Sequence, residues 1–95
     1  MGAIRRLVLD TLKPHKPSII EMASQLSDME GVSAVNISIY EVDRKVENAK
    51  ITIEGSDITS TDVMDLIEEL GGAIHSVDEV VAGDRIIDDA ATLQD

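Results

Sequence analysis

The sequence lacks cysteine, phenylalanine and tryptophan, and Tyr40 is its single tyrosine. Without cysteine the chain cannot form disulfides, thiolate metal sites or a cysteine nucleophile. No apolar run approaches the roughly 20 residues of a membrane-spanning helix. The apolar stretch near the N-terminus is too short for a secretory signal, and Asp10 interrupts it. We therefore expect a cytoplasmic protein that does not associate with membranes.

Positive charge is also scarce, because 8 Lys and Arg residues face 19 Asp and Glu residues, for a formal net charge of -11. A chain this acidic is not expected to bind nucleic acid by general electrostatic attraction. The basic residues are unevenly spread, and four of them lie in residues 1–16. The acidic remainder is either a solvated surface or a surface that includes a cation site.

Aliphatic side chains supply nearly all of the 43% hydrophobic content. The length predicts a single domain over residues 1–95, with an acidic C-terminal tail over residues 83–95. A domain of this size buries little surface alone, which favours association with further copies.

Four segments alternate apolar and polar residues, which is typical of half-buried strands. They are residues 3–12, 33–43, 49–54 and 73–82. Two further segments have helical spacing. The first follows a break at residues 13–17 and begins with Ser18 and Glu21 in capping-box spacing. The second begins at Thr59 or Ser60 and ends at a glycine pair, residues 71–72.

This order of elements predicts an α+β, ferredoxin-like βαββαβ sandwich. Its sheet would be four-stranded, of antiparallel type and in the order 4-1-3-2, with two helices on one face. Within it we expect the first strand to pair in parallel with the third and antiparallel with the fourth. The two middle strands, residues 33–43 and 49–54, would form a hairpin.

Catalytic patterns are missing. No serine, histidine and acid stand at motif-like spacing, and His15 and His75 are isolated along the chain. The strands lack the stacked aromatic residues of RNA-binding modules with this topology. We therefore expect a protein that is not an enzyme.

Two groups of acids are candidate cation sites. The expected register brings Asp10, Glu54 and His75 to one corner of the open face of the sheet. Carboxylate ligands suit Ca²⁺ or Mg²⁺, whereas a site that includes the histidine suits Zn²⁺. Around the hairpin turn, carboxylates recur without EF-hand spacing, at Glu41, Asp43 and Glu47. Ordinary surface polarity is the competing interpretation of both groups.

A basic loop precedes the first helix. Helix N-termini attract anions, so the loop and the cap form a candidate anion site made of Lys13, His15, Lys16 and Ser18. The competing interpretation is a charged turn that offsets the acidic surface. The same register places Arg6 beside Glu79 as a cross-strand ion pair.

Four segments resemble one family of short archaeal proteins. They are RRLVLDTLKPHKPS (5–18), EGVSAVNISIYEVD (30–43), ENAKITIEG (47–55) and GGAIHSVDEVVAG (71–83). The family is known as domain of unknown function 211, and the resemblance covers residues 3–87. It implies a ferredoxin-like fold, an archaeal cytoplasmic setting and self-assembly, for which a ring is one arrangement. It implies no catalytic activity.

Together these patterns predict a non-enzymatic, homo-oligomeric binding protein, with a divalent cation as a candidate ligand. The two edge strands, an open face bearing Val8, Tyr40 and Val77, and tail residues that need cover (Ile86, Ile87 and Leu93) favour self-association. The alternative is a small regulatory domain that senses an anionic metabolite at the loop of residues 13–16.

Overall fold

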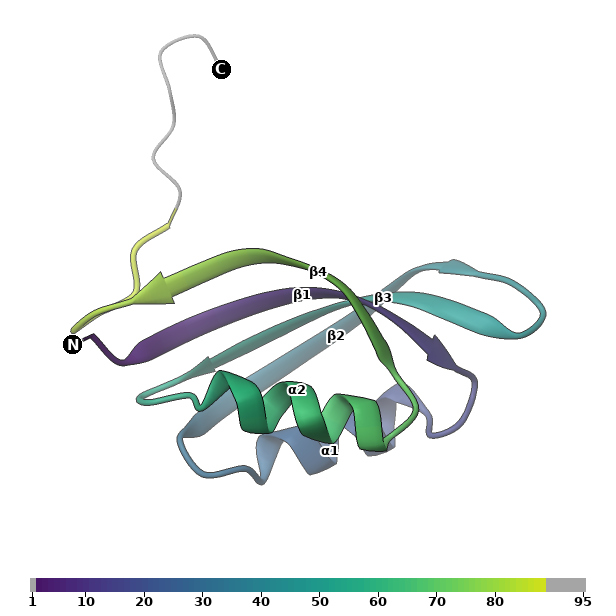
Figure 1. Ribbon diagram of the computed structural model, residues 1–95, viewed down its shortest axis with the longest axis horizontal. Helices are drawn as coiled ribbons and strands as arrows, with labels where there is room; N and C mark the ends of the chain where they lie inside the picture. The colour runs from purple at the N-terminus through teal and green to yellow at the C-terminus, as the bar shows by residue number, and fades with distance from the viewer. Residues whose placement is uncertain (1, 89–95) are drawn as a thin grey trace, which may run out of the picture.

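The computed structural model describes residues 2–88. The elements follow the order β1 (Ile4–Pro14), α1 (Ile19–Ser27), β2 (Val32–Val42), β3 (Val46–Gly55), α2 (Ser60–Glu69) and β4 (Ala73–Ala82). The strands form one sheet in the order β2-β3-β1-β4, which is the predicted order counted from the other edge. Both helices lie on the same face of this sheet (Figure 1). The ferredoxin-like prediction is confirmed.

The core lies between the sheet and the helices, and its buried side chains come from β1, α1, β3 and α2 and from Ile58 in the loop before α2. Alternate residues of β1 and β3 point into it, while each helix contributes one stripe. Its fully or nearly fully buried members are Leu7, Leu9, Met22, Leu26, Ile51, Ile53, Ile58, Val63 and Ile67. The Ser18 side chain caps α1 by accepting a hydrogen bond from the Glu21 N–H at 3.2 Å, as predicted. Neither helix within residues 2–88 has the length and apolar character needed to cross a lipid bilayer.

The predicted parallel pairing of the first and third strands is wrong, because β1 runs antiparallel to both β3 and β4. The reason lies in the connections. The α1 crossover makes β1 and β2 parallel, and the tight hairpin then reverses β3. Since β3 inserts between β1 and β2, it must oppose both.

The first strand also extends further than predicted. Lys13 and Pro14 still pair with β3, opposite Glu47 and Val46, so the expected break at residue 13 was placed too early. Proline is tolerated at the end of a strand because its missing N–H no longer interrupts the ladder.

The β2–β3 hairpin is correspondingly longer, and its turn shortens to residues 43–45. In that turn the Asp43 carboxylate accepts hydrogen bonds from the N–H groups of Lys45 (2.9 Å) and Val46 (3.0 Å). The hairpin reaches beyond the ends of the helices (Figure 1).

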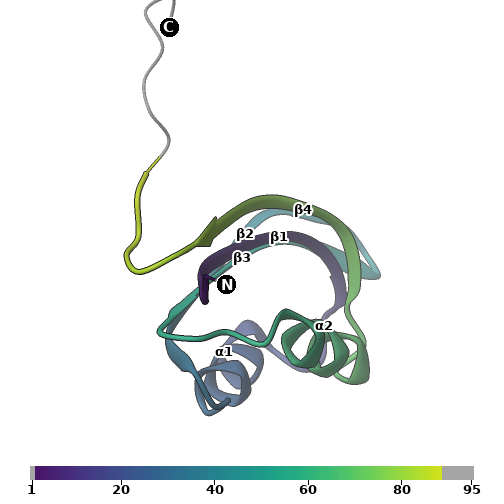
Figure 2. The ribbon, with the colours of Figure 1, turned by 60° about the vertical axis from the view of Figure 1, so that its left-hand side comes forward.

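The sheet curves over the helices and leaves its other face open (Figure 2). The β4 edge is irregular, since its register with β1 shifts between the Val8–Glu79 and Leu9–Val77 pairs. Asp78 is therefore the extra residue of a β-bulge, which twists the edge strand locally. This open face and the hairpin end carry most of the charged side chains discussed below.

Candidate functional site

The first predicted cation site is not assembled. Asp10 lies opposite Lys50 of β3 and Ser76 of β4, whereas Glu54 lies opposite Arg6, four residues away along β1. The expected meeting of Asp10 and Glu54 depended on parallel pairing and is therefore wrong. His75 precedes Ser76 on β4 and is exposed, so it is the nearer of the two expected partners of Asp10 in register.

The open face has instead an acidic corner around Tyr40. The Tyr40 hydroxyl donates a hydrogen bond to Oδ1 of Asp10. This bond is the largest cause that raises the pKa of Tyr40 to about 12, with smaller effects from partial desolvation and from the carboxylates of Glu41 and Asp78. The corner joins side chains of β1, β2 and the β4 bulge, and Lys50 of β3 lies opposite Asp10 beside it.

The acids of the hairpin, the second predicted cation site, take separate partners. Glu41 accepts from the side chain of Asn48 at 3.0 Å, and the backbone N–H groups of Lys45 and Val46 lower the pKa of Asp43. Glu47 turns to the other side and contacts Lys13 of β1 and His15 of the loop after it. Across residues 2–88, no three metal-ligating side chains are grouped closely enough to hold an ion.

Glu47 belongs to a cluster that includes a buried lysine. The Lys13 ammonium donates to Oε1 of Glu47 at 2.8 Å and to the Pro14 carbonyl at 2.7 Å. The Lys13 side chain has no exposed surface, and that of Glu47 keeps only 15%. The antiparallel register places the two residues opposite each other, and both lie on the core side of the sheet, in phase with Leu9 and Ile51.

His15 completes this cluster from the loop. Its Nδ1 lies 3.0 Å from Oε2 of Glu47, and its Nε2 lies 3.0 Å from the carbonyl oxygen of Arg44 in the hairpin turn. The hydrogen bond with Glu47 is the main cause that raises the pKa of His15. In return, Lys13 first and His15 second lower the pKa of Glu47. We call Lys13, His15 and Glu47 the hairpin cluster.

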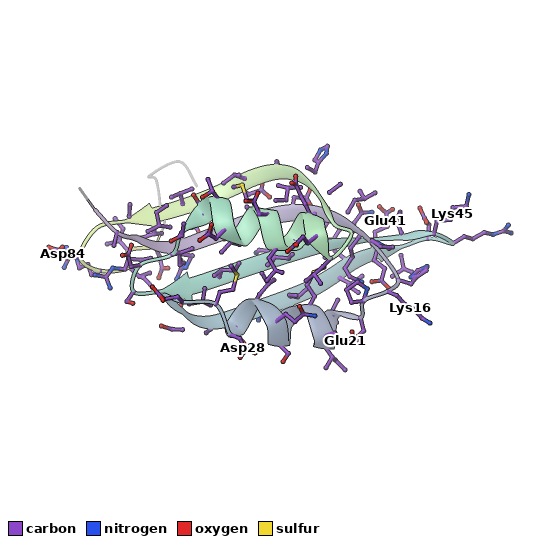
Figure 3. All side chains as sticks on the ribbon, turned by 60° about the horizontal axis from the view of Figure 1, so that its bottom comes forward. Lys16, Glu21, Asp28, Glu41, Lys45 and Asp84 are labelled. Carbon is purple, nitrogen blue, oxygen red and sulfur yellow. The ribbon has the colours of Figure 1, made fainter. Side chains whose placement is uncertain are left out.

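The four residues of the predicted anion site do not converge. Lys13 and His15 are bound to Glu47, and Ser18 caps α1. Lys16 is exposed and lies at the same end of the molecule as Lys45 of the hairpin turn, away from Asp84 (Figure 3). Among the three basic residues of this set, Lys16 is thus the one whose side chain faces solvent without a hydrogen bond in the described structure.

At the opposite end of the ladder, Arg6 lies among three carboxylates. It contacts Glu54 at 2.8 Å, Asp88 at 2.9 Å and Glu79 at 3.5 Å. The predicted cross-strand pair of Arg6 and Glu79 is confirmed. Beside it, a shallow trough of about 480 Å³ runs over β2 and β3, lined by Ala34, Val35, Asn36, Ser38, Lys50, Thr52 and Glu54.

Apolar side chains are exposed along both edges of the sheet. They are Tyr40 and Val42 on β2 and Val77 and Val80 on β4, followed by Ile86 and Ile87. Leu93, the remaining tail residue for which cover was expected, lies outside the described residues. Each edge therefore combines apolar side chains with one side of backbone that no strand within residues 2–88 pairs.

The sequence interpretation missed the hairpin cluster. The available signal was phase, because Lys13 continues the alternation of Leu7, Leu9 and Thr11, which are all buried. A lysine in that phase must find a buried partner or disrupt the strand.

Comparison with known proteins places the chain in a family and names no activity. The family model DUF211, described as "Uncharacterized ArCR", matches residues 5–95. A protein of Methanocaldococcus jannaschii, described as "Uncharacterized protein MJ0319", is 50% identical over 95 residues, which are 100% of this chain and 98% of that protein. The chain therefore belongs to the DUF211 family.

Proposed function

We propose that this chain is a non-enzymatic binding protein that associates with copies of itself through the two edges of its sheet. The observation that carries the proposal is the exposure of Val42 on β2 and of Val77 and Val80 on β4. Edge strands with apolar side chains template pairing with another chain unless something covers them. The domain is small, so added burial would stabilise it appreciably.

The two edges differ, and this difference determines the kind of assembly. If β2 of one copy joins β4 of the next, the contact is head-to-tail and repeats from copy to copy. Such a contact closes into a ring or continues as a filament, depending on the rotation per step. A finite ring agrees with the self-assembly expected from the family resemblance.

Light scattering coupled to size exclusion tests the association. We expect a mass well above the 10.3 kDa of one chain at micromolar concentration. Val42→Lys and Val80→Lys place a charge on either edge and should each return the protein to a monomer. Ile20→Lys is the matched control, since Ile20 is an exposed apolar residue of α1 and belongs to neither edge strand. A monomeric wild-type protein, or equal dissociation by Ile20→Lys, would refute the proposal.

Ca²⁺ or Mg²⁺ is the ligand that the charge of this surface favours. The net charge is -11, and the carboxylates of Asp10, Glu41 and Asp78 each raise the pKa of Tyr40, although they are not grouped closely enough to enclose an ion. Carboxylates spread over a surface in this way attract hard cations through their charge, and Zn²⁺ is the candidate if His75 takes part. We expect Ca²⁺ or Mg²⁺ to raise the melting temperature and Asp10→Asn to reduce that shift. No stabilisation by Ca²⁺, Mg²⁺, Mn²⁺ or Zn²⁺ would remove the cation from the proposal and leave self-association unaffected.

Sensing of an anionic metabolite at the loop of residues 13–16 is the alternative function. Lys16 would be its exposed cation, next to the N-terminus of α1. Thermal shifts with a panel of phosphorylated and carboxylated metabolites test it. Stabilisation that disappears in Lys16→Ala would favour this alternative, whereas stabilisation that persists in the variant would exclude the loop.

A further inference from the structure

The ring of His15 lies between two hydrogen-bond acceptors. One is the carboxylate Oε2 of Glu47 and the other is the backbone carbonyl of Arg44, each 3.0 Å from a ring nitrogen. Neither acceptor carries a proton to donate when Glu47 is ionised. A neutral imidazole has one N–H and one lone pair, so it can satisfy only one of them. Only the imidazolium donates from both nitrogens.

We propose that His15 is a pH-sensitive latch, which fastens the loop after β1 to the β2–β3 hairpin when it is protonated and releases the turn of residues 43–45 when it loses its proton. The latch goes beyond the proposed self-association and does not depend on it. In the neutral form one ring nitrogen presents a lone pair to an acceptor at 3.0 Å, and this contact is repulsive rather than bonding.

Charged groups from every neighbouring element bear on His15. Lys13 of β1 takes Oε1 of Glu47 and leaves Oε2 to the histidine. Asp43 in the turn adds a second carboxylate, which interacts favourably with the charged ring. The cations Lys16, Arg44 and Lys45 oppose protonation, but all three side chains are exposed, so water and salt screen them. The two direct contacts of the ring are therefore the largest influences on its protonation.

Release is confined to the end of the hairpin. The contact of Lys13 with Glu47 is fully buried on the lysine side and does not need the histidine. It holds the base of the hairpin in either state. The turn beyond it projects past the helices (Figure 1), where the Arg44 carbonyl is the backbone atom that the histidine holds. The single N–H of the neutral ring stays with the charged carboxylate, which is the stronger acceptor. Loss of the proton therefore removes the hydrogen bond to the Arg44 carbonyl and leaves the ladder below it paired.

Nuclear magnetic resonance of the whole chain tests the latch. We expect the His15 ring to titrate with a pKa above 6.5. Over the same pH range the amides of Asp43 and Val46, which are hydrogen-bonded in the turn, should lose protection against exchange, after correction for the intrinsic exchange rate. Amides of residues 49–53 should keep theirs.

Two matched substitutions separate the latch from a general effect of pH. His15→Gln keeps a neutral polar side chain and leaves Lys13 paired with Glu47. We therefore expect a folded protein in which the protection of the turn amides against exchange no longer depends on pH above 6. His75→Gln makes the same change on β4 and should behave as wild type. The proposal would be overturned by a His15 pKa at or below 6.5. It would also be overturned if the turn amides of the His15→Gln protein kept the pH-dependent exchange protection of wild type.

Discussion

Two ion pairs in the same β1–β3 ladder share one contact distance and differ in almost everything else. Lys13 with Glu47 and Arg6 with Glu54 are each directly opposite in register and each meet at 2.8 Å. The first pair lies on the core side, with the lysine wholly buried and 15% of the Glu47 side chain exposed. The second lies on the open face, with 17% and 37% exposed.

The number of alternative partners separates the two pairs. Arg6 also contacts Glu79 and Asp88, so the loss of Glu54 leaves it with two carboxylates and with water. Lys13 has one carboxylate and the Pro14 carbonyl. The energetic value of an ion pair therefore depends less on its distance than on what surrounds the partner that remains.

Removal of the Glu47 charge should have the largest effect. Glu47→Gln leaves a buried ammonium without its carboxylate, and broken buried pairs typically cost about 3–5 kcal/mol. Because the carboxylate is partly exposed and glutamine can still accept a hydrogen bond, we expect a loss of about 2–3 kcal/mol in the free energy of unfolding. Urea unfolding followed by far-ultraviolet circular dichroism measures it. A loss within experimental error would show that Lys13 reaches water in the folded protein.

A double-mutant cycle isolates the interaction itself. Lys13→Met replaces the ammonium by an apolar side chain of similar length, so Lys13→Met combined with Glu47→Gln should be more stable than Glu47→Gln alone. We expect a coupling of about 1–2 kcal/mol between the two sites. Additive effects would mean that the two side chains do not interact in solution.

The open-face pair should respond much less. Glu54→Gln leaves Arg6 with Glu79 and Asp88, and exposed pairs contribute little. We expect a loss several-fold smaller than that of Glu47→Gln in the same urea titration, and smaller still in 1 M salt because screening is stronger there. A loss equal to that of Glu47→Gln would erase the difference between the two ends of the ladder.

The pH dependence should be the subtlest difference. Since the folded-state pKa of Glu47 is lowered, its stabilisation is present above the unfolded value of 4.5 and disappears as the pH falls through the folded value. The pKa of His15 is raised, so its stabilisation is complete below the unfolded value of 6.5 and is lost as the pH rises through the folded value.

The hairpin cluster should therefore stabilise the fold most between pH 4.5 and 6.5. Melting temperatures across pH 3–9 for wild type and His15→Gln measure the window. We expect the two proteins to differ most inside it and to converge at alkaline pH. A difference that grows with rising pH would have the wrong sign and would contradict a charged His15.

Periodicity predicted the elements and their faces, because aliphatic residues alternate in residues 33–43 and 49–54 and recur at helical spacing after Ser18. Periodicity does not state the direction of a neighbouring strand, however. That direction follows from the connections between the strands. The expected parallel direction placed Asp10 beside Glu54 in the predicted sheet and kept Glu47 away from Lys13. Chain connectivity would have corrected it without coordinates.

Other features had no sequence signal. The bulge at Asp78 adds one residue to an edge strand, and a single inserted residue leaves no periodic trace in a segment whose valines, Val77, Val80 and Val81, do not alternate. The contact of His15 with the Arg44 carbonyl joins two turns, whose backbone paths cannot be calculated from local preferences. Such contacts between turns emerge only once the register of the strands is fixed.

The bond between Tyr40 and Asp10 has a practical consequence for spectroscopy. With one tyrosine and no tryptophan in the chain, the entire ultraviolet emission of the protein comes from a single ring. That ring lies on the outermost strand β2 and is bonded to a carboxylate two strands away, on β1. Any molecule that settles on this edge or displaces the carboxylate would change the emission and the alkaline absorbance titration of that one phenol, so the protein carries its own label at the surface where a partner is expected.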